Sequence, residues 1–235
     1  MKYVIADNRI PKKALASLKD LGFSPILLPC SPSLAEPVSA HPDMLIFFGD
    51  KIYFPHDYYK AAGTELELIA SVKKSELAPC DIKLRSSYPD DIAFNALQLR
   101  ETLLCKEKSL CPDIADYAKK SGIRLLNIAQ GYARCATCKV SDTALITADP
   151  SVKKAAYALG IDVLFISEGG VLLPGYGHGF IGGASGTDGE NVYFCGSLSL
   201  HPDGKIISDF CKKHKKEAVS LSDEPLYDVG TMFFI

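Results

Sequence analysis

The amino-acid sequence predicts one α/β domain in which a strand–strand–helix–strand module occurs five times and closes into a five-fold pseudosymmetric α/β-propeller. The first observation is a period, which is the sequence signature of modular architectures. The second strands of the modules are expected to begin in steps of 49, 51, 41 and 48 residues, close to one fifth of the 235-residue chain, near Lys2, Lys51, Thr102, Thr143 and Asn191.

The second observation concerns the two ends of the chain. The N-terminal module lacks its first strand, and the chain finishes in a lone strand over 231–235 with no helix after it. Pairing the two ends would complete a fifth module and remove two exposed sheet edges. The third observation is the absence of a Gly/Ser-rich linker in a chain that is 47% hydrophobic, which favours a single domain spanning 1–235.

The clearest module lies between Gln130 and Ile166. Strands are predicted over 134–140 and 144–147, with turn residues between them. Asp149-Pro150 predicts a helix start, because a carboxylate accepts the free N–H groups and proline fits the first turn. Gly160 predicts the helix end, and the apolar run 161–166 predicts a strand buried on both faces.

The first two modules follow from the same signals. The N-terminal module is expected as a strand, a helix closed by Gly22 and a strand, at 2–7, 11–21 and 25–28. The second module is expected as a hairpin, a short helix and a strand, at 44–48, 52–54, 58–62 and 66–70.

The third and fifth modules repeat the order of the central one. The third is expected as two strands, a helix closed by Gly122 and a strand, at 92–99, 102–105, 112–120 and 124–128. The fifth is expected as two strands, a helix and a strand, at 180–184, 192–195, 202–214 and 218–221.

Composition excludes several classes of function. The formal net charge is −2, so neither nucleic acid nor an anionic membrane is expected as a partner. The basic run Lys212–Lys216 stands at a predicted helix C-terminus, where the helix dipole favours cations. No signal sequence or membrane-spanning run is recognised, and the eight cysteines are expected to be reduced thiols, so we expect a cytoplasmic protein. A homo-oligomer is compatible with the sequence.

Neither a metal nor a cofactor is expected. Cys135 and Cys138 are three residues apart on a predicted strand, so their sulfurs would point to opposite faces, and no second pair has zinc-site spacing. The glycine-rich stretch 182–189 lacks the Lys-Ser/Thr of a phosphate-binding loop and a following helix. It is interpreted as a hairpin loop.

A ring of five such modules resembles the pentein fold, also called the guanidino-group-modifying enzyme fold, over the whole chain. The segment 87–95 is similar to a first-strand segment of the dimethylarginine hydrolases. Three further segments resemble a bacterial pentein family without an established activity: 41–44 (His-Pro-Asp-Met), 130–132 (Gln-Gly-Tyr) and 179–183 (Gly-Phe-Ile-Gly-Gly).

The resemblance implies where a site would be. In penteins the first strand of each module lines a pocket on the ring axis, and those strands are expected to begin near Asp43, Asp90, Cys135, His178 and Thr231. The enzymes of the fold carry a cysteine nucleophile on the C-terminal strand, a histidine and acids that hold a guanidinium. Carboxylates suit a planar cation with paired N–H donors, and a thiolate can attack its central carbon.

Three polar residues are candidates for ligand binding. Asp43 and Asp90 each stand close after a proline and just before a first strand, and each could instead cap a turn. Asn95 is polar within an apolar strand, so it is either a pocket residue or a buried amide bonded to the backbone.

Two more candidates carry catalytic chemistry. His178 lies in a glycine-rich segment at the position where the resemblance puts the catalytic histidine, although the same glycines could only make a tight turn. Cys135 begins another first strand and is the candidate for a relocated nucleophile.

The usual nucleophile is missing, because no cysteine follows Cys211 and the closing strand offers only Met232, Phe233 or Phe234. We therefore expect a catalytically divergent pentein that binds a small polar ligand, guanidino or amino-acid-like, in the axial pocket. One alternative is an amidine or guanidine hydrolase, or an amidinotransferase-like enzyme, that uses Cys135. Another is a non-catalytic module that binds a protein or the ribosome.

Overall fold

The computed structural model describes residues 2–235 and contains five three-stranded sheets of one design. In each sheet a middle strand pairs antiparallel with one neighbour and parallel with the other. The middle strands are β1 (Lys2–Asp7), β4 (Ile52–Pro55), β7 (Thr102–Cys105), β10 (Ala144–Thr147) and β14 (Asn191–Phe194). They begin at or within a residue of the positions that the sequence period predicted.

The flanking strands complete the five sheets. The antiparallel partners are β17 (Phe233–Phe234), β3 (Phe47–Phe48), β6 (Leu97–Leu99), β9 (Thr137–Ser141) and β13 (Ser185–Thr187). The parallel partners are β2 (Phe23–Leu28), β5 (Leu77–Cys80), β8 (Arg124–Asn127), β11 (Asp162–Phe165) and β15 (Glu217–Ser220). A sixth, two-stranded parallel sheet joins β12 (Val171–Leu172) to β16 (Leu226–Tyr227) and was not predicted.

In each three-stranded sheet the chain forms a helix between the middle strand and the strand that pairs parallel with it. These helices are α1 (Lys12–Asp20), α3 (Tyr59–Lys73), α4 (Pro112–Lys120), α5 (Pro150–Ala158) and α6 (Gly204–Lys213). Asp149 caps α5 as predicted, since its carboxylate accepts the N–H groups of Ser151 and Val152. The remaining helices are α2 (Pro42–Leu45) and the 3₁₀ turns η1 (Glu36–Val38), η2 (His56–Tyr58), η3 (Glu107–Ser109) and η4 (Leu198–Leu200).

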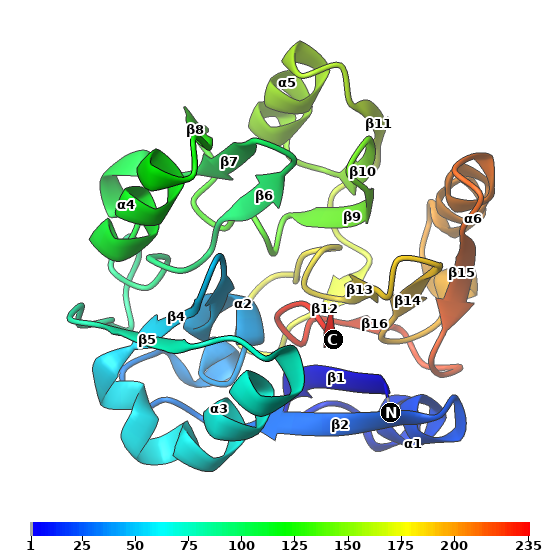
Figure 1. The fold of residues 1–235 in the computed structure, drawn as a ribbon. Helices are drawn as coiled ribbons and strands as arrows, with labels where there is room; N and C mark the ends of the chain where they lie inside the picture. The colour runs from blue at the N-terminus through cyan, green and yellow to red at the C-terminus, as the bar shows by residue number, and fades with distance from the viewer. Residues whose placement is uncertain (1) are drawn as a thin grey trace.

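The two ends of the chain lie side by side. β1 pairs antiparallel with β17 through Val4–Phe234 and Ile5–Phe233, and Tyr3 exchanges two backbone hydrogen bonds of 3.0 Å with Ile235. In Figure 1 the five sheets follow one another around the centre of the view, with α1, α3, α4, α5 and α6 on the outside. The sheets are separate units, and none formed by residues 2–235 closes on itself.

The predicted first strands begin two to five residues later than expected. They start at Phe47, Leu97, Thr137, Ser185 and Phe233, where the sequence analysis placed them at 44, 92, 134, 180 and 231. The residues in between form turns or, at 42–45, the short helix α2, which proline opens at its first position. Backbone bonds such as Asn95 N–H to Ile92 O and Ala136 N–H to Tyr132 O hold these turns. Polar candidate residues such as Asn95 and Cys135 therefore sit on turns rather than strands.

The second module differs most from the prediction. The segment 66–70 was expected as a strand and belongs to α3, because Ala62, Leu66 and Ile69 bury one face at helical spacing. The parallel strand of this sheet is β5, where Pro79 weakens the strand signal. β5 is an edge strand, which is where a sheet tolerates proline.

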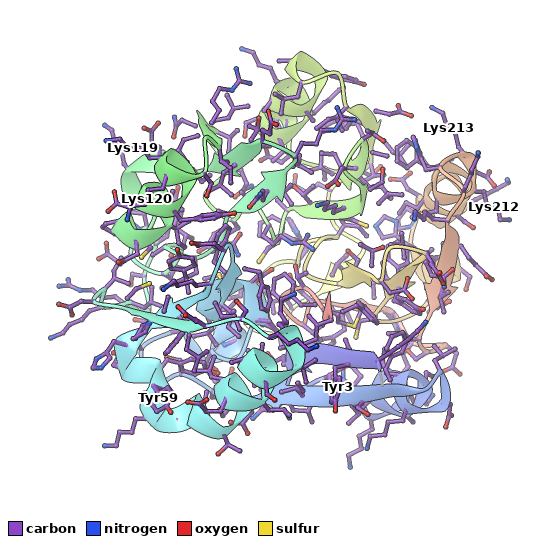
Figure 2. All side chains as sticks on the ribbon, viewed as in Figure 1. Tyr3, Tyr59, Lys119, Lys120, Lys212 and Lys213 are labelled. Atoms are coloured by element: carbon purple, nitrogen blue, oxygen red, sulfur yellow. The ribbon has the colours of Figure 1, made fainter. Side chains whose placement is uncertain are left out.

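Apolar side chains fill the spaces between helices and sheets in four clusters of buried residues, the largest around Met44, Phe54 and Phe94. Lysines occupy the last turns of α4 and α6 and point outward in Figure 2, as the dipole argument for the basic run predicted. None of the helices within 2–235 has the length and apolar character that crossing a membrane requires.

Candidate functional site

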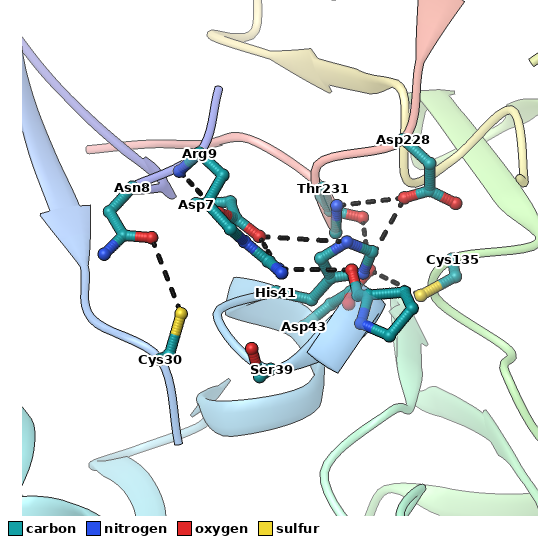
Figure 3. A network of polar contacts seen from close by, with 12 residues as sticks. Asp7, Asn8, Arg9, Cys30, Ser39, His41, Asp43, Cys135, Asp228 and Thr231 are labelled. Carbon is teal, nitrogen blue, oxygen red and sulfur yellow. Dashed lines mark hydrogen bonds and ion pairs between the residues drawn. The ribbon is translucent and has the colours of Figure 1, made fainter. Parts of the chain in front are cut away.

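A buried carboxyl, a thiol and a hydroxyl meet where the loops before β9 and β17 approach α2. Asp43, in the first turn of α2, is 1% exposed. Its Oδ2 accepts hydrogen bonds from the Thr231 hydroxyl at 2.7 Å and the Cys135 thiol at 3.0 Å, as Figure 3 shows. Its Oδ1 is buried without a hydrogen-bond partner. Burial raises the pKa of the Asp43 carboxyl group. Burial and the nearby negative charge of Asp43 together raise the pKa of the Cys135 thiol well above its usual range.

Asn95 holds the cysteine in place. Its Oδ1 accepts the backbone N–H groups of Arg134 and Cys135 at 2.8 and 3.3 Å, and its Nδ2 lies 3.0 Å from Cys135 Sγ. The amide is 1% exposed and therefore fixes both the backbone and the thiol of the turn before β9. Of the two interpretations of Asn95, the structure shows the buried amide bonded to backbone, and the amide also contacts the candidate nucleophile without lining either of the two cavities that flank the cluster.

A buried histidine lies between two carboxyl groups beside this cluster. His41 Nε2 is 3.9 Å from Asp7 Oδ2, and His41 Nδ1 is 3.8 Å from Asp228 Oδ1. Burial lowers the pKa of His41, which favours the neutral imidazole, and Nδ1 has no hydrogen-bond partner. Asp7 is neutralised by Arg9 Nη2 at 2.6 Å.

Asp228 is held by the backbone rather than by a cation. Its Oδ1 accepts the N–H of Gly230 at 3.0 Å and its Oδ2 accepts the N–H of Phe180 at 2.8 Å. Burial raises the pKa of Asp228, and the two N–H donors oppose that shift. A side chain at Gly183 would overlap Asp228, and one at Gly230, where φ is +69°, would overlap His41, so both glycines permit the close approach.

Four chemically active side chains line one cavity, which we call the histidine cavity. Its volume is about 130 Å³, and the four side chains are His41, Cys135, His178 and Asp228. The rest of the wall consists of aromatic and aliphatic residues: Val38, Met44, Tyr132, Leu173, Tyr176 and Phe180. Asp43 lines a second cavity of about 200 Å³ with Arg134 and Phe233, so the cluster separates two hollows.

The candidate residues named from the sequence do not all gather. Asp43, Asn95 and Cys135 are in contact, and His178 lines the histidine cavity while its ring nitrogens face Gly179 O at 3.0 Å and Glu168 Oε1 at 3.2 Å.

Asp90 lies apart from this cluster. It is exposed, with its nearest cation Arg85 at 3.9 Å. Its neighbour Asp91 is the buried acid, and it accepts the hydroxyl of the cavity residue Tyr132 at 2.7 Å.

Three members of the cluster were not among the candidates from the sequence: His41, Asp228 and Thr231. His41 stands two residues before Asp43 in the His-Pro-Asp-Met segment of the family resemblance, and that spacing was a usable signal. Met232, at the predicted nucleophile position, is 1% exposed and packs in the core beside β1. Thr231 points its hydroxyl at Asp43, but a hydroxyl that donates to a buried carboxyl is no substitute for a thiolate.

One further property concerns metal ions. The candidate ligand atoms of His41, Asp43 and Cys135 lie within 4.8 Å of one another. The set of N, O and S donors is of the kind that binds zinc. The sequence analysis predicted no metal here.

Comparison with known proteins identifies the fold. The profile of a family of unknown function (DUF6873) matches residues 5–233. No curated protein sequence matches the chain. Agmatine deiminase from C. jejuni superposes with a TM-score of 0.55 at 10% identity, covering 94% of this chain and 87% of that one.

Two dimethylarginine dimethylaminohydrolase structures are also similar. The enzyme (DDAH) from Pseudomonas aeruginosa, a mutant complexed with citrulline, superposes with a TM-score of 0.55 at 8% identity, covering 93% and 92% of the two chains. A second, an adduct with a chloropyridine, gives 0.51 at 9% identity, covering 94% and 92%. At these identities the likeness shows the fold, which is the pentein fold predicted from the sequence.

Proposed function

The chain belongs to the family of unknown function (DUF6873) and has the pentein fold, and from this premise we propose that it binds a small cationic ligand of the guanidinium class in the histidine cavity. The observation that carries the proposal is Asp228, a buried carboxyl group on the wall of the histidine cavity that has no Lys or Arg ion pair among residues 2–235. The buried Asp43, which borders the neighbouring cavity, has no such ion pair either. Buried carboxylates are otherwise paired or protonated, so this site favours a cation supplied from outside.

The donors of a guanidinium match the unsatisfied acceptors of the site. In the histidine cavity His41 Nδ1 is buried without a partner and Asp228 lines the wall; Asp43 Oδ1, also without a partner, belongs to the residue that borders the neighbouring cavity. A guanidinium offers five N–H donors in one plane and no acceptor. A cavity of about 130 Å³ is ample for such a head group, since a water needs only roughly 10–15 Å³. The structural neighbours agmatine deiminase and dimethylarginine dimethylaminohydrolase are named for guanidino substrates.

Thermal unfolding with ligands tests the binding. A ligand at about 100 times its dissociation constant stabilises by about 2.7 kcal/mol, which for a chain of this size raises Tm by roughly 5–11 °C. We expect this for agmatine, arginine or methylarginine and not for the neutral analogues citrulline and urea. The Asp43→Asn and Asp228→Asn variants should lose most of the shift, while Asp90→Asn, which removes an exposed acid outside the cluster, should keep it. An unchanged Tm with all cationic compounds at saturation rejects the proposal.

A second candidate function is hydrolysis of the bound guanidine through Cys135. The observation that favours it is that Cys135, His41 and His178 line one cavity. Burial and the nearby carboxyl groups raise the pKa of Cys135, so the free site holds a thiol. A bound cation would offset the carboxylates and favour the thiolate, because opposite charge nearby stabilises the charged form. The sulfur would then attack the central carbon as the thiol proton passes to a histidine, and that histidine would give the proton to the leaving amine before water cleaves the C–S bond.

Product analysis separates binding from hydrolysis. If Cys135 is the nucleophile, ammonia or an amine is released from a ligand that binds, and release stops in Cys135→Ser while the ligand-induced Tm shift remains. Release that survives in Cys135→Ser rules out this role for the cysteine. A Tm shift without any product leaves the binding function as the answer.

We also propose that the five sheets form a five-fold pseudosymmetric propeller whose axis passes through the histidine cavity. Five sheets of identical strand order and the pairing of β1 with β17 support this arrangement. The segments that precede β3, β9 and β17, the first of them helix α2, carry Asp43, Cys135 and Thr231, so corresponding segments of different modules supply the cluster. Limited proteolysis should find both termini protected, whereas rapid trimming of 231–235 would argue against it.

A further inference from the structure

A second cluster of metal-ligating atoms lies outside the lining of the histidine cavity. It contains the thiols of Cys80 and Cys111 and the carboxylate of Asp113, whose ligand atoms all lie within 4.8 Å of one another. Cys80 is the last residue of β5, Cys111 directly precedes α4, and Asp113 is in the first turn of α4. The two cysteines are buried and Asp113 is exposed, so the cluster reaches the surface on the carboxylate side.

The spacing of these atoms matches a shared ion. In tetrahedral zinc sites the Zn–S distance is about 2.3 Å and the Zn–O distance about 2.0 Å, which puts the sulfur and oxygen roughly 3.5 Å apart. Cys111 Sγ and Asp113 Oδ2 are 3.6 Å apart. That separation is a thiol–carboxylate hydrogen bond in the metal-free chain, and it is also the separation expected of two ligands of one metal.

The surroundings favour negative ligands. Cys111 is the residue at the N-terminal end of α4, a helix of nine residues, and the positive end of the helix dipole stabilises thiolates and carboxylates there. A disulfide would involve only the two cysteine sulfurs and would not account for the nearby carboxylate. A zinc-type ion would bind that carboxylate as a third ligand. Three protein ligands with an exposed side leave the fourth position to water.

We propose that Cys80, Cys111 and Asp113 bind a thiophilic divalent metal ion of the zinc class, which joins β5 of the second sheet to α4 of the third. Both elements lie on the left of Figure 1, in neighbouring sheets. The proposal is independent of the ligand-binding function. No sequence motif marks the site, because a long loop and the β6–β7 hairpin stand between Cys80 and Cys111 in the chain.

Metal titration of the full chain tests the site. The protein is stripped with a chelator under a thiol reductant, and Zn²⁺ binding is measured by competition with a chromophoric chelator. Co²⁺ is added in parallel, since thiolate ligands give Co²⁺ a characteristic charge-transfer absorption. We expect one ion per chain, bound at least about 100-fold more weakly in Cys111→Ser and in Cys80→Ser, and at least about tenfold more weakly in Asp113→Asn.

The controls separate this cluster from the other cysteines. Cys105→Ser removes a buried thiol of the same core cluster and should leave Zn²⁺ affinity unchanged, as should Cys135→Ser. Asp113→Asn alters an exposed residue, so its result does not depend on a core substitution being tolerated. Loss of binding in Cys135→Ser alone would move the ion to the His41–Asp43–Cys135 group and overturn the proposal. Absence of thiolate absorption with Co²⁺, or a Cys80–Cys111 disulfide that forms equally fast with and without Zn²⁺, would overturn it as well.

Discussion

Replacing the two buried acids of the site by asparagine should have unequal consequences for stability, large at Asp228 and small at Asp43. Asp228 uses both carboxyl oxygens, one for the N–H of Gly230 and the other for the N–H of Phe180. Asparagine offers only one oxygen, so its NH₂ group would face a backbone donor. Asp43 uses Oδ2 alone, for Cys135 and Thr231, and its Oδ1 has no partner. An asparagine there can keep both hydrogen bonds and put its NH₂ group at the vacant position.

The magnitudes follow from this difference. Loss of a hydrogen bond to a charged acceptor, with a buried donor left unpaired, costs about 1.5–3 kcal/mol. We therefore expect Asp228→Asn to lower the free energy of unfolding by about 2–3 kcal/mol and Tm by roughly 4–12 °C. Asp43→Asn should change the free energy of unfolding by less than about 1 kcal/mol, because it removes an ionisable group that burial disfavours.

Urea unfolding of the ligand-free protein at neutral pH measures both values. The slope of the free energy against urea should be the same for wild type, Asp43→Asn and Asp228→Asn, so that midpoints report stability alone. Asp90→Asn serves as the control for removing an exposed acid. Equal losses for the two variants, or a larger loss for Asp43→Asn, would refute the hydrogen-bond assignment on which the site rests.

Three further predictions concern pH, thiol reactivity and capping. Burial raises the pKa of Asp43 above its unfolded value, so its contribution to stability is complete below the unfolded pKa and is lost as pH rises through the folded pKa. The stability of wild type relative to Asp43→Asn should therefore increase as pH is lowered from neutral toward the ordinary carboxyl range in urea titrations, and a flat difference would contradict this. Iodoacetamide should modify the exposed Cys30 first and the buried Cys135 last, and peptide mass spectrometry that finds Cys135 modified first would show an open site. Asp149→Ala removes the acceptor of two N–H groups at the start of α5 and should cost about 1 kcal/mol in the free energy of unfolding, whereas Asp149→Ser should restore most of it.

The regular elements of the fold could be predicted from the sequence because their signals are local. The period of the middle strands, the Asp149-Pro150 start of α5 and the glycines after α1, α4 and α5 depend on neighbouring residues only. The prediction for the second module was wrong where local signals compete. Residues 66–70 are apolar enough for a strand, but they belong to α3. β5 was missed because proline interrupts a short edge strand.

The site divides in the same way. The sequence and its family resemblance singled out Asp43, Asn95 and Cys135, which the fold brings into contact. The sequence analysis chose Asp90 as the acid near the site, but the structure buries its neighbour Asp91 against Tyr132 and leaves Asp90 exposed. Within a turn, sequence patterns do not show which of two adjacent residues points inward.

Only the tertiary structure brought His41 between Asp7 and Asp228, or Cys80 beside Cys111. Hydrophobic periodicity acts over a few residues and so fixes helices and strands. A polar cluster assembled from distant loops depends on how the sheets are placed relative to one another, and no local pattern in the chain encodes that placement.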